Sequence, residues 1–110
     1  MSVVVSTRNR ASLLPDCLRS LATQRSELAF EVVVVDNGSN DATPEVVRDW
    51  IRRDERFRLV EEPTVGLSHA KNAGLRNARG QLVLFTDDDV VVPDGWIAAY
   101  TSFFAGRARL

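Results

Sequence analysis

The chain has 110 residues and a formal net charge of -1, and 45% of its residues are hydrophobic and 26% charged. This length allows one domain, residues 1–110, and the composition is typical of a globular protein with a buried core. The near-neutral charge gives no general attraction to nucleic acid or to an anionic membrane, so partners must bind at a local site. Apolar stretches such as Val32–Val35 are too short to span a membrane, and the amino terminus lacks a signal-peptide layout, so we expect a cytoplasmic protein.

Strands and helices are predicted to alternate from the amino terminus onward. Ser2–Ser6 is predicted as the first strand, and Thr7–Arg10 as the loop that follows its carboxyl end. A helix comes next, with Ser12 as its N-cap, Pro15 in its first turn and leucines at helical spacing on one face. Phe30–Val35 is the second strand, and its run of valines is typical of a strand covered on both faces.

The turn sequence Asp36–Ser39 separates this strand from a second helix, which we expect Thr43 to cap. Phe57–Glu61 is predicted as a short third strand. A third helix is expected to be capped by Ser68, to run to about residue 79 and to be ended by Gly80. Its small residues at positions 70, 73, 74 and 78 would form a face that allows close packing.

Leu82–Phe85 is predicted as the fourth strand, Val90–Val92 as a brief further strand, and Trp96 to Phe104 as a final helix. This alternation indicates an α/β fold, a three-layer α/β/α arrangement around a mainly parallel sheet. The carboxyl ends of parallel strands share one edge of the sheet, and ligands bind there at the point where the strand order reverses. The polar loops that follow the strands should therefore meet in one crevice.

Three consecutive carboxylates, Asp87, Asp88 and Asp89, follow the fourth strand. Like charges on adjacent residues oppose folding, whereas Mg²⁺ or Mn²⁺ converts the repulsion into coordination. In an extended chain Asp87 and Asp89 point to the same side, so the two are predicted to share one ion. The alternative interpretation is a solvated strand end or a helix cap.

Other polar residues of the crevice have both functional and structural interpretations. Asp36 is a candidate acceptor of hydrogen bonds from a base or ribose, or else a cap of its own turn. Arg8, Arg10 and Lys71 are candidate partners of phosphate, or else solvated surface residues. His69 has no second ligand at metal-site spacing and is expected to be structural.

Four sequence motifs, in order, resemble those of the family 2 glycosyltransferases, whose nucleotide-sugar domain has the GT-A fold. The segment VVVSTRNR at positions 3–10 resembles an opening strand and a P-T-Y-N-R loop, and EVVVVDNGSND at 31–41 resembles E-I-I-V-V-D-D-G-S-T-D. The segment GLSHAKNAGLRNARG at 66–80 resembles G-x-x-x-A-R-N-x-G-x-x-x-A-x-G, and FTDDD at 85–89 resembles a D-x-D motif. Ser6 and Arg8 stand where Pro and Tyr are commoner, which leaves the first loop without an aromatic side chain to stack on a base.

The resemblance implies a donor site with a role for each matching residue. Asp36 would bind the nucleobase, and Asp87 and Asp89 would hold Mg²⁺ or Mn²⁺ against the diphosphate. The nucleotide-sugar-binding residues that it implies are Ser6, Thr7, Arg8, Asp36, Lys71, Asn72, Asp87 and Asp88.

The reaction that the resemblance implies is inverting transfer of a sugar from a nucleoside diphosphate sugar to an acceptor hydroxyl. The catalytic base of the family lies in the acceptor half, downstream of the D-x-D motif, so we expect it beyond the end of this chain at Leu110. The chain is therefore expected to be the donor-binding half. Without the acceptor half, apolar side chains should be exposed and favour self-association or a second chain; they are Val90–Val92, Trp96, Ile97, Tyr100, Phe103 and Phe104.

Two other classes of function remain open from the sequence. One is a module that binds a nucleotide without transferring a sugar, which the missing base favours. The other is a phosphatase of the haloacid dehalogenase type, whose nucleophile motif is also Asp-x-Asp after a hydrophobic strand. That class places the motif on the first strand with a Lys after it, and no Lys follows Asp89 in this chain.

Overall fold

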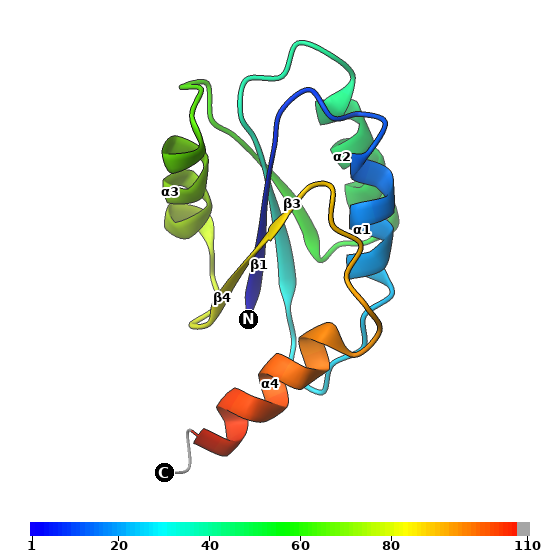
Figure 1. Ribbon diagram of the computed structural model, residues 1–110, viewed down its shortest axis with the longest axis vertical. Coiled ribbons are helices and arrows are strands. Elements are labelled where there is room, and N and C mark those ends of the chain that lie inside the picture. Colours follow the sequence, from blue (N-terminus) through cyan, green and yellow to red (C-terminus); the bar gives the residue numbers. More distant parts are fainter. Residues whose placement is uncertain (108–110) are drawn as a thin grey trace.

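The protein is described by a computed structural model that covers residues 1–107, with side chains described as far as Phe103. Strands and helices alternate along the chain (Figure 1). The strands are β1 (Ser2–Thr7), β2 (Glu31–Asp36), β3 (Phe57–Glu61) and β4 (Val83–Asp87), and the helices are α1 (Leu14–Ala22), α2 (Thr43–Arg53), α3 (Leu67–Asn77) and α4 (Trp96–Arg107).

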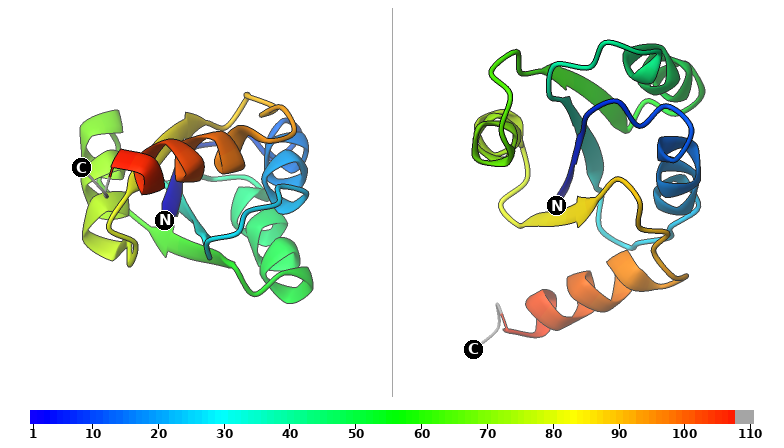
Figure 2. Two further views of the ribbon diagram at one scale, coloured as in Figure 1. Left: turned by 90° about the horizontal axis from the view of Figure 1, so that it is seen from below. Right: turned by 45° about the horizontal axis from the view of Figure 1, so that its top comes forward.

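Within residues 1–107 the strands form one sheet in the order β3-β2-β1-β4, and each neighbouring pair is parallel. Helices α1 and α2 cover one face of the sheet, and α3 covers the other (Figures 1 and 2). The predicted three-layer α/β/α fold with a parallel sheet is thus confirmed. The chain winds from β1 to β3 in one direction and then places β4 on the opposite side of β1, so the strand order reverses between β1 and β4.

Two apolar clusters lie on the two faces of the sheet, because successive residues of a strand point to opposite faces. On the α1 and α2 face, alternate valines of β1 and β2 pack with the leucines of α1; the fully buried members include Val3, Val5, Leu14, Leu18, Leu21, Val32 and Val34. On the α3 face the cluster is Val4, Val33, Val35, Ala70 and Ala73. Burial on both sides explains why the valine runs are continuous rather than alternating with polar residues.

Close approach of α3 to the sheet depends on the small residues predicted for that helix face. A Cβ added at Gly74 would lie 2.4 Å from Cγ1 of Val4, which is closer than real Cβ atoms come. Gly80 has a different role from the predicted one, since α3 already ends at Asn77. A Cβ at Gly80 would lie 2.6 to 2.8 Å from the backbone of Met1 and Ser2, so this glycine lets the chain pass the start of β1.

The predicted helix caps are wrong, because the helices begin at other residues than expected. Ser12 lies in a turn ahead of α1, and Ser68 is the second residue of α3. Thr43 is the first residue of α2, and its backbone N–H donates to Oδ1 of Asp41 at 3.0 Å. The carboxylate of Asp41 therefore performs the capping role that the sequence pattern had assigned to Thr43.

The segment Val90–Val92 is not a strand, contrary to the prediction. The backbone N–H of Val92 donates to Oγ of Ser20 in α1 at 3.1 Å instead of to a neighbouring strand. Gln24 fixes the next part of the chain, since its amide accepts a hydrogen bond from the N–H of Ile97 and donates one to the carbonyl of Pro93. These contacts place the start of α4 against α1, near the amino end of the sheet (Figure 2).

The expected apolar exposure around α4 is confirmed for some side chains and wrong for others. Val92 and Ile97 are buried, because the contacts with Ser20 and Gln24 draw them into the core. Val90, Val91, Tyr100 and Phe103 are exposed, while Trp96 is partly buried. The side chain of Phe104 lies outside the described residues. None of the helices within residues 1–107 is long and apolar enough to cross a membrane.

Candidate functional site

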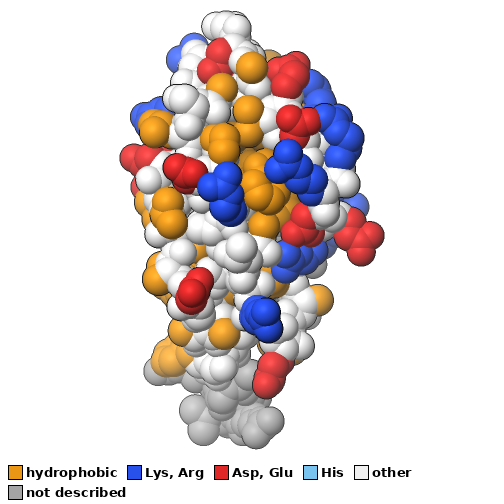
Figure 3. Space-filling view, turned by 90° about the vertical axis from the view of Figure 1, so that its right-hand side faces the viewer, with side chains coloured by type: hydrophobic (Ala, Val, Ile, Leu, Met, Phe, Trp, Pro, Cys, Tyr) orange, Lys and Arg blue, Asp and Glu red, His pale blue; other side chains and the backbone are white. Residues whose placement is uncertain are grey.

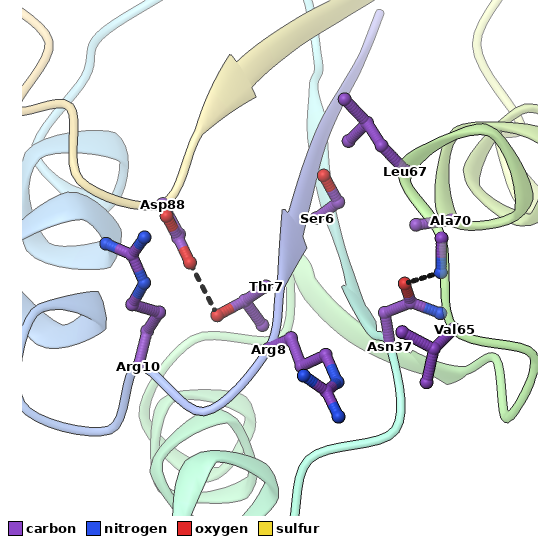
Figure 4. A pocket seen from close by; sticks show the side chains of 10 residues that line it. Ser6, Thr7, Arg8, Arg10, Asn37, Val65, Leu67, Ala70 and Asp88 are labelled. Carbon is purple, nitrogen blue, oxygen red and sulfur yellow. Dashed lines mark hydrogen bonds between the residues drawn. The ribbon is translucent and has the colours of Figure 1, made fainter.

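A pocket of about 270 Å³ opens at the carboxyl edge of the sheet, close to where the strand order reverses. It is built from the loops that follow β1, β2, β3 and β4 and from the first turn of α3 (Figure 4). The lining residues are Ser6, Thr7, Arg8, Arg10, Asn37, Val65, Gly66, Leu67, Ala70 and Asp88. The backbone N–H groups at the start of α3 add a positive potential to this end of the pocket.

The loops after β1 and β4 are joined by one side-chain contact inside the pocket. Oγ1 of Thr7 donates to Oδ2 of Asp88 at 2.9 Å (Figure 4). Thr7 and Asp36 lie two residues after Val5 and Val34 on their strands, so alternation places them on the same face of the sheet, the one that α1 and α2 cover. The same alternation puts Asp87 on the α3 face, so Asp36 and Asp87 lie on opposite faces of the sheet at its carboxyl edge.

The acidic segment does not have the extended geometry that was expected of it. Strand β4 ends at Asp87, and the N–H of Val90 donates to the carbonyl of Asp87 at 3.2 Å, which closes a turn through Asp88 and Asp89. The prediction that Asp87 and Asp89 point to the same side assumes an extended chain through Asp89. That assumption is wrong, because the strand ends at Asp87 and a turn follows. Asp87 and Asp89 are exposed, and Asp88 is partly buried.

Cys17 of α1 lies directly beneath this turn, and its Sγ donates to the carbonyl oxygen of Asp87 at 3.5 Å. Burial raises the pKa of the Cys17 thiol to about 12, and the negative charges of Asp88, Asp89 and Asp87 add to the effect. The side chain is therefore a neutral thiol at physiological pH and packs as a small buried residue.

Asp36 ends β2 with its side chain almost fully buried, at 5% exposure. Its Oδ1 has no hydrogen-bond partner among the described residues. A buried carboxylate oxygen without a donor costs free energy, which a donor group on a ligand would recover. This feature favours the ligand-binding interpretation of Asp36 over the turn-capping one.

Asn37 is a functional residue that the sequence analysis missed. Its Nδ2 donates to the carbonyls of Glu62 and Thr64 at 3.0 and 2.9 Å, and its Oδ1 accepts from the N–H of Gly66 at 2.9 Å. The side chain thereby holds the loop after β3 in place as one wall of the pocket. The Asn-Gly turn signal pointed to a local role, whereas the actual partners lie 25 to 29 residues away.

The loop after β1 is fixed by hydrogen bonds to the loop after β2. Asn9 has a left-handed backbone conformation, with φ of 52°, which asparagine adopts more readily than most residues. Four hydrogen bonds join this loop to the loop after β2 and to the first residue of α2: Asn9 N to Ser39 Oγ, Asn40 N to Asn9 Oδ1, Arg10 N to Thr43 Oγ1 and Ala11 N to Asp41 Oδ2. They hold the backbone between Arg8 and Arg10 and just after Arg10.

The structure brings Ser6, Thr7, Arg8 and Asp88 together around the pocket, as the sequence analysis predicted for residues that follow strands. Arg8 and Arg10 are exposed. Asp36, Asp87 and Asp89 are not among the residues that line the pocket, and neither are Lys71 and Asn72. Both are exposed residues of α3, and the Nζ of Lys71 lies 5.7 Å from the ring centroid of Phe85 in β4. His69, also exposed, lies in the first turn of the same helix.

The surface outside the pocket shows no segregation of charge on the side that is seen in Figure 3. Acidic and basic side chains are interspersed there with hydrophobic atoms over α1 and α2. The exposed ion pairs of these helices, such as Arg19 with Asp16 and Arg48 with Glu45, connect residues three apart on one helix. Such pairs contribute little to stability, so we assign this face no binding role.

Comparison with known protein families gives a match over residues 2–106 to the family described as Glycosyl transferase family 2. The chain belongs to this family. The sequence-based recognition is thus confirmed, and so is the GT-A fold, because the similar solved structures are GT-A glycosyltransferases.

A curated relative, validoxylamine A glucosyltransferase of Streptomyces hygroscopicus subsp. jinggangensis, is 39% identical over 111 residues, which cover 98% of this chain. The crystal structure of S. aureus TarS 1–349 in complex with UDP-GlcNAc matches with a TM-score of 0.84 and 30% identity over 96% of the chain. The mannosyltransferase PcManGT of Pyrobaculum calidifontis, in complex with GDP-Man and Mn²⁺, matches with a TM-score of 0.75 and 38% identity over 84% of the chain.

These proteins are much longer than the chain described here. The chain spans 26% of the length of the glucosyltransferase, 31% of the TarS chain and 28% of the PcManGT chain. The family match over residues 2–106 includes the residues of the pocket and of the acidic turn.

Proposed function

We propose that residues 1–110 form a single donor-binding domain, which binds a nucleoside diphosphate sugar together with Mg²⁺ or Mn²⁺ for inverting transfer of the sugar to an acceptor hydroxyl. The observation that carries the proposal is the unsatisfied, buried Oδ1 of Asp36 at the carboxyl edge of the sheet. A nucleobase or ribose that reached this oxygen would supply the missing donor. Family membership and the nucleotide-sugar complexes of similar proteins support the same conclusion.

In this proposal the residues of the site divide between the nucleoside and the diphosphate. Asp36 accepts a hydrogen bond from the nucleoside, and Ser6, Thr7 and Arg8 line the nucleotide pocket. Asp87 and Asp88 face the diphosphate sugar at the edge of β4. Lys71 and Asn72, on the exposed side of α3, would contact the donor only at its outer end.

The donor set fits a hard divalent cation, with Asp87 and Asp89 as its proposed protein ligands. No group of three His, Cys, Asp or Glu side chains within the described residues is arranged to hold a metal ion. Proteins usually bind Mg²⁺ through one or two carboxylates together with substrate phosphates rather than through a complete protein cage. When bound, such an ion would stabilise the charge that develops on the leaving diphosphate.

The remaining part of the reaction, deprotonation of the acceptor hydroxyl, is not assigned to any residue described here. We propose that the base lies downstream of the acidic turn, in a part of the longer relatives that this chain does not span. A cytoplasmic location and association with a second chain also stay predictions.

A second candidate function is nucleotide binding without sugar transfer, which needs only the pocket at the carboxyl edge of the sheet. The phosphatase interpretation is set aside, because the acidic motif follows β4, the last strand, and the chain belongs to a glycosyltransferase family.

The proposal is tested by thermal unfolding with UDP, GDP, UDP-GlcNAc and GDP-mannose, each with and without Mn²⁺. A ligand at a hundred times its dissociation constant stabilises a protein by about 2.7 kcal/mol. We expect stabilisation by at least one of the nucleotides with Mn²⁺ and a much smaller effect on the Asp36→Ala variant. An unchanged melting curve with every nucleotide and metal would overturn the donor-site assignment.

A further inference from the structure

The pocket lining has an excess of positive charge whose use the metal-based assignment does not explain. Arg8 and Arg10 line the pocket together with a single carboxylate, that of Asp88. Within the described part of the chain neither guanidinium takes part in an ion pair, whereas the carboxylate of Asp88 accepts a hydrogen bond from Thr7. Two arginines without an ion-pair partner among the described residues, beside a single carboxylate that is already hydrogen-bonded, favour binding of an anionic ligand.

The backbone that carries these arginines is held in place before any ligand binds. The four hydrogen bonds to the loop after β2 and to the first residue of α2, and the left-handed conformation of Asn9, fix the chain between the two arginines and just after Arg10. A sparsely populated backbone conformation that the surroundings enforce is a recognised feature of ligand sites. The close-up shows Arg10 on the Asp88 side of Thr7 and Arg8 on the Asn37 side (Figure 4). The two guanidinium groups therefore lie on different sides of Thr7 in the pocket.

We propose that Arg8 and Arg10 bind the diphosphate of the donor directly, through contacts that do not need the metal ion. The inference rests on the proposed function, since it assigns these residues a part of the same donor. A guanidinium presents a planar fork of donors that matches phosphate oxygens, and it stays charged at any physiological pH. The positive charge of the arginines offsets the repulsion between the diphosphate and the three carboxylates that follow β4.

This assignment also explains why the loop has arginine rather than an aromatic residue at position 8. An aromatic ring at that position would stack on a base, and the strength of that contact depends little on the salt concentration. A guanidinium contributes a charged contact to phosphate, which weakens as salt screens it. The nucleoside is then read by Asp36 and the diphosphate by the arginines, so the two parts of the ligand can be tested separately.

The test is isothermal titration of the whole chain in EDTA with UDP, uridine and pyrophosphate, and in parallel with GDP and guanosine. The variants are Arg8→Gln and Arg10→Gln, and Arg52→Gln on the exposed face of α2 is the matched control. Loss of a hydrogen bond to a charged group should weaken binding of the diphosphate by roughly tenfold to a hundredfold. We expect this loss in both pocket variants for UDP or GDP, no change for the nucleoside, and competition of pyrophosphate with the nucleotide.

Three results would overturn the inference, and they are distinguishable from one another. If the pocket variants bind UDP and GDP in EDTA as tightly as the parent, the arginines are solvated surface residues and the donor site stands. If nucleotide binds the parent only with Mn²⁺, the metal-independent contacts do not exist. If no nucleotide binds with Mn²⁺ either, the proposed function itself fails. Melting curves of the ligand-free variants, expected to match that of the parent, check that the exposed substitutions leave the fold intact.

Discussion

Substitution of Asn37 by Asp should separate the role of its amide group from its size. In the structure the amide nitrogen donates to two carbonyls, and the amide oxygen accepts from the N–H of Gly66. A carboxylate of the same shape keeps the last contact but cannot donate, so the carbonyls of Glu62 and Thr64 would face a negative oxygen. Asn37 is 5% exposed, which limits the access of water to the carboxylate that replaces its amide.

The magnitude follows from the two lost donors. Each ordinary hydrogen bond contributes about 0.5–1.5 kcal/mol, and an acceptor left unpaired in a partly buried site adds to the loss. We therefore expect Asn37→Asp to lower the free energy of unfolding by about 1–3 kcal/mol, and the melting temperature by roughly 5–20 °C for a domain of this size. The pocket should suffer as well, because the loop after β3 loses two of its three attachments to Asn37.

Urea unfolding followed by circular dichroism measures the stability, and titration with a nucleoside diphosphate and Mn²⁺ measures the pocket. Asn40→Asp is the matched control, because its side chain is exposed and only its backbone takes part in the loop contacts. The control should change stability by less than about 0.5 kcal/mol. If Asn37→Asp is as stable as the control, the three hydrogen bonds to the 62–66 loop do not hold that wall of the pocket.

Four further substitutions test the packing, the electrostatics and the acidic turn. Gly74→Ala should destabilise the protein in urea by about 1–2 kcal/mol, because overpacking against Val4 outweighs the better helix propensity of Ala; an effect as small as that of Ser68→Ala on the same helix would contradict this. Partial burial opposes the charged form of Glu31, but hydrogen bonds from Ser2, Arg79 and Arg58 lower its pKa, so its contribution to stability is present above pH 4.5 and is lost as the pH falls through the folded-state pKa. Urea unfolding from pH 6 to pH 3 should therefore show a shallower loss of stability for Glu31→Gln than for the parent, and equal slopes would refute this. Asp87→Asn and Asp89→Asn should each remove the effect of Mn²⁺ on nucleotide binding. The melting temperature without metal should be unchanged or higher, because a repulsive charge is gone. If the variants respond to Mn²⁺ as the parent does, the acidic turn is only a solvated strand end.

The sheet could be predicted from the sequence because its information is local and strongly periodic. The valine runs in β1 and β2 lie on strands covered on both faces, and β3 has the bounds Phe57–Glu61 that the sequence indicated. The helix starts could not be predicted in the same way. At the start of α1 the N–H of Leu14 donates to the carbonyl of Arg10, and at the start of α2 the N–H of Thr43 donates to the carboxylate of Asp41. The cap is therefore not the nearest Ser or Thr in either helix.

The candidate site was predicted where its residues directly follow strands and missed where it depends on contacts between loops. The strand-end rule brought Thr7, Arg8 and Asp88 to one edge, and the structure places all three on the pocket. Val65, Gly66 and Leu67 belong to a segment that the side chain of Asn37 holds in place, and no local sequence pattern indicates this contact. The positions of Lys71 and Asn72 follow from the phase of α3, which turns Leu67 and Ala70 toward the pocket and the next two residues away from it.

The two halves of the pocket differ in what holds them, and this difference determines how nucleotide and metal binding are coupled. On one side the loops after β1, β2 and β3 are joined to each other by hydrogen bonds from Asn9 and Asn37. On the other side the acidic turn meets β1 through Thr7 and Asp88, and its three carboxylates repel both each other and an incoming diphosphate. A cation at the turn would remove this repulsion, so metal and diphosphate should each raise the affinity of the other by the same factor. In this proposal Arg8 and Arg10 would set the affinity that remains without metal, and the carboxylates would set the additional affinity that the metal provides.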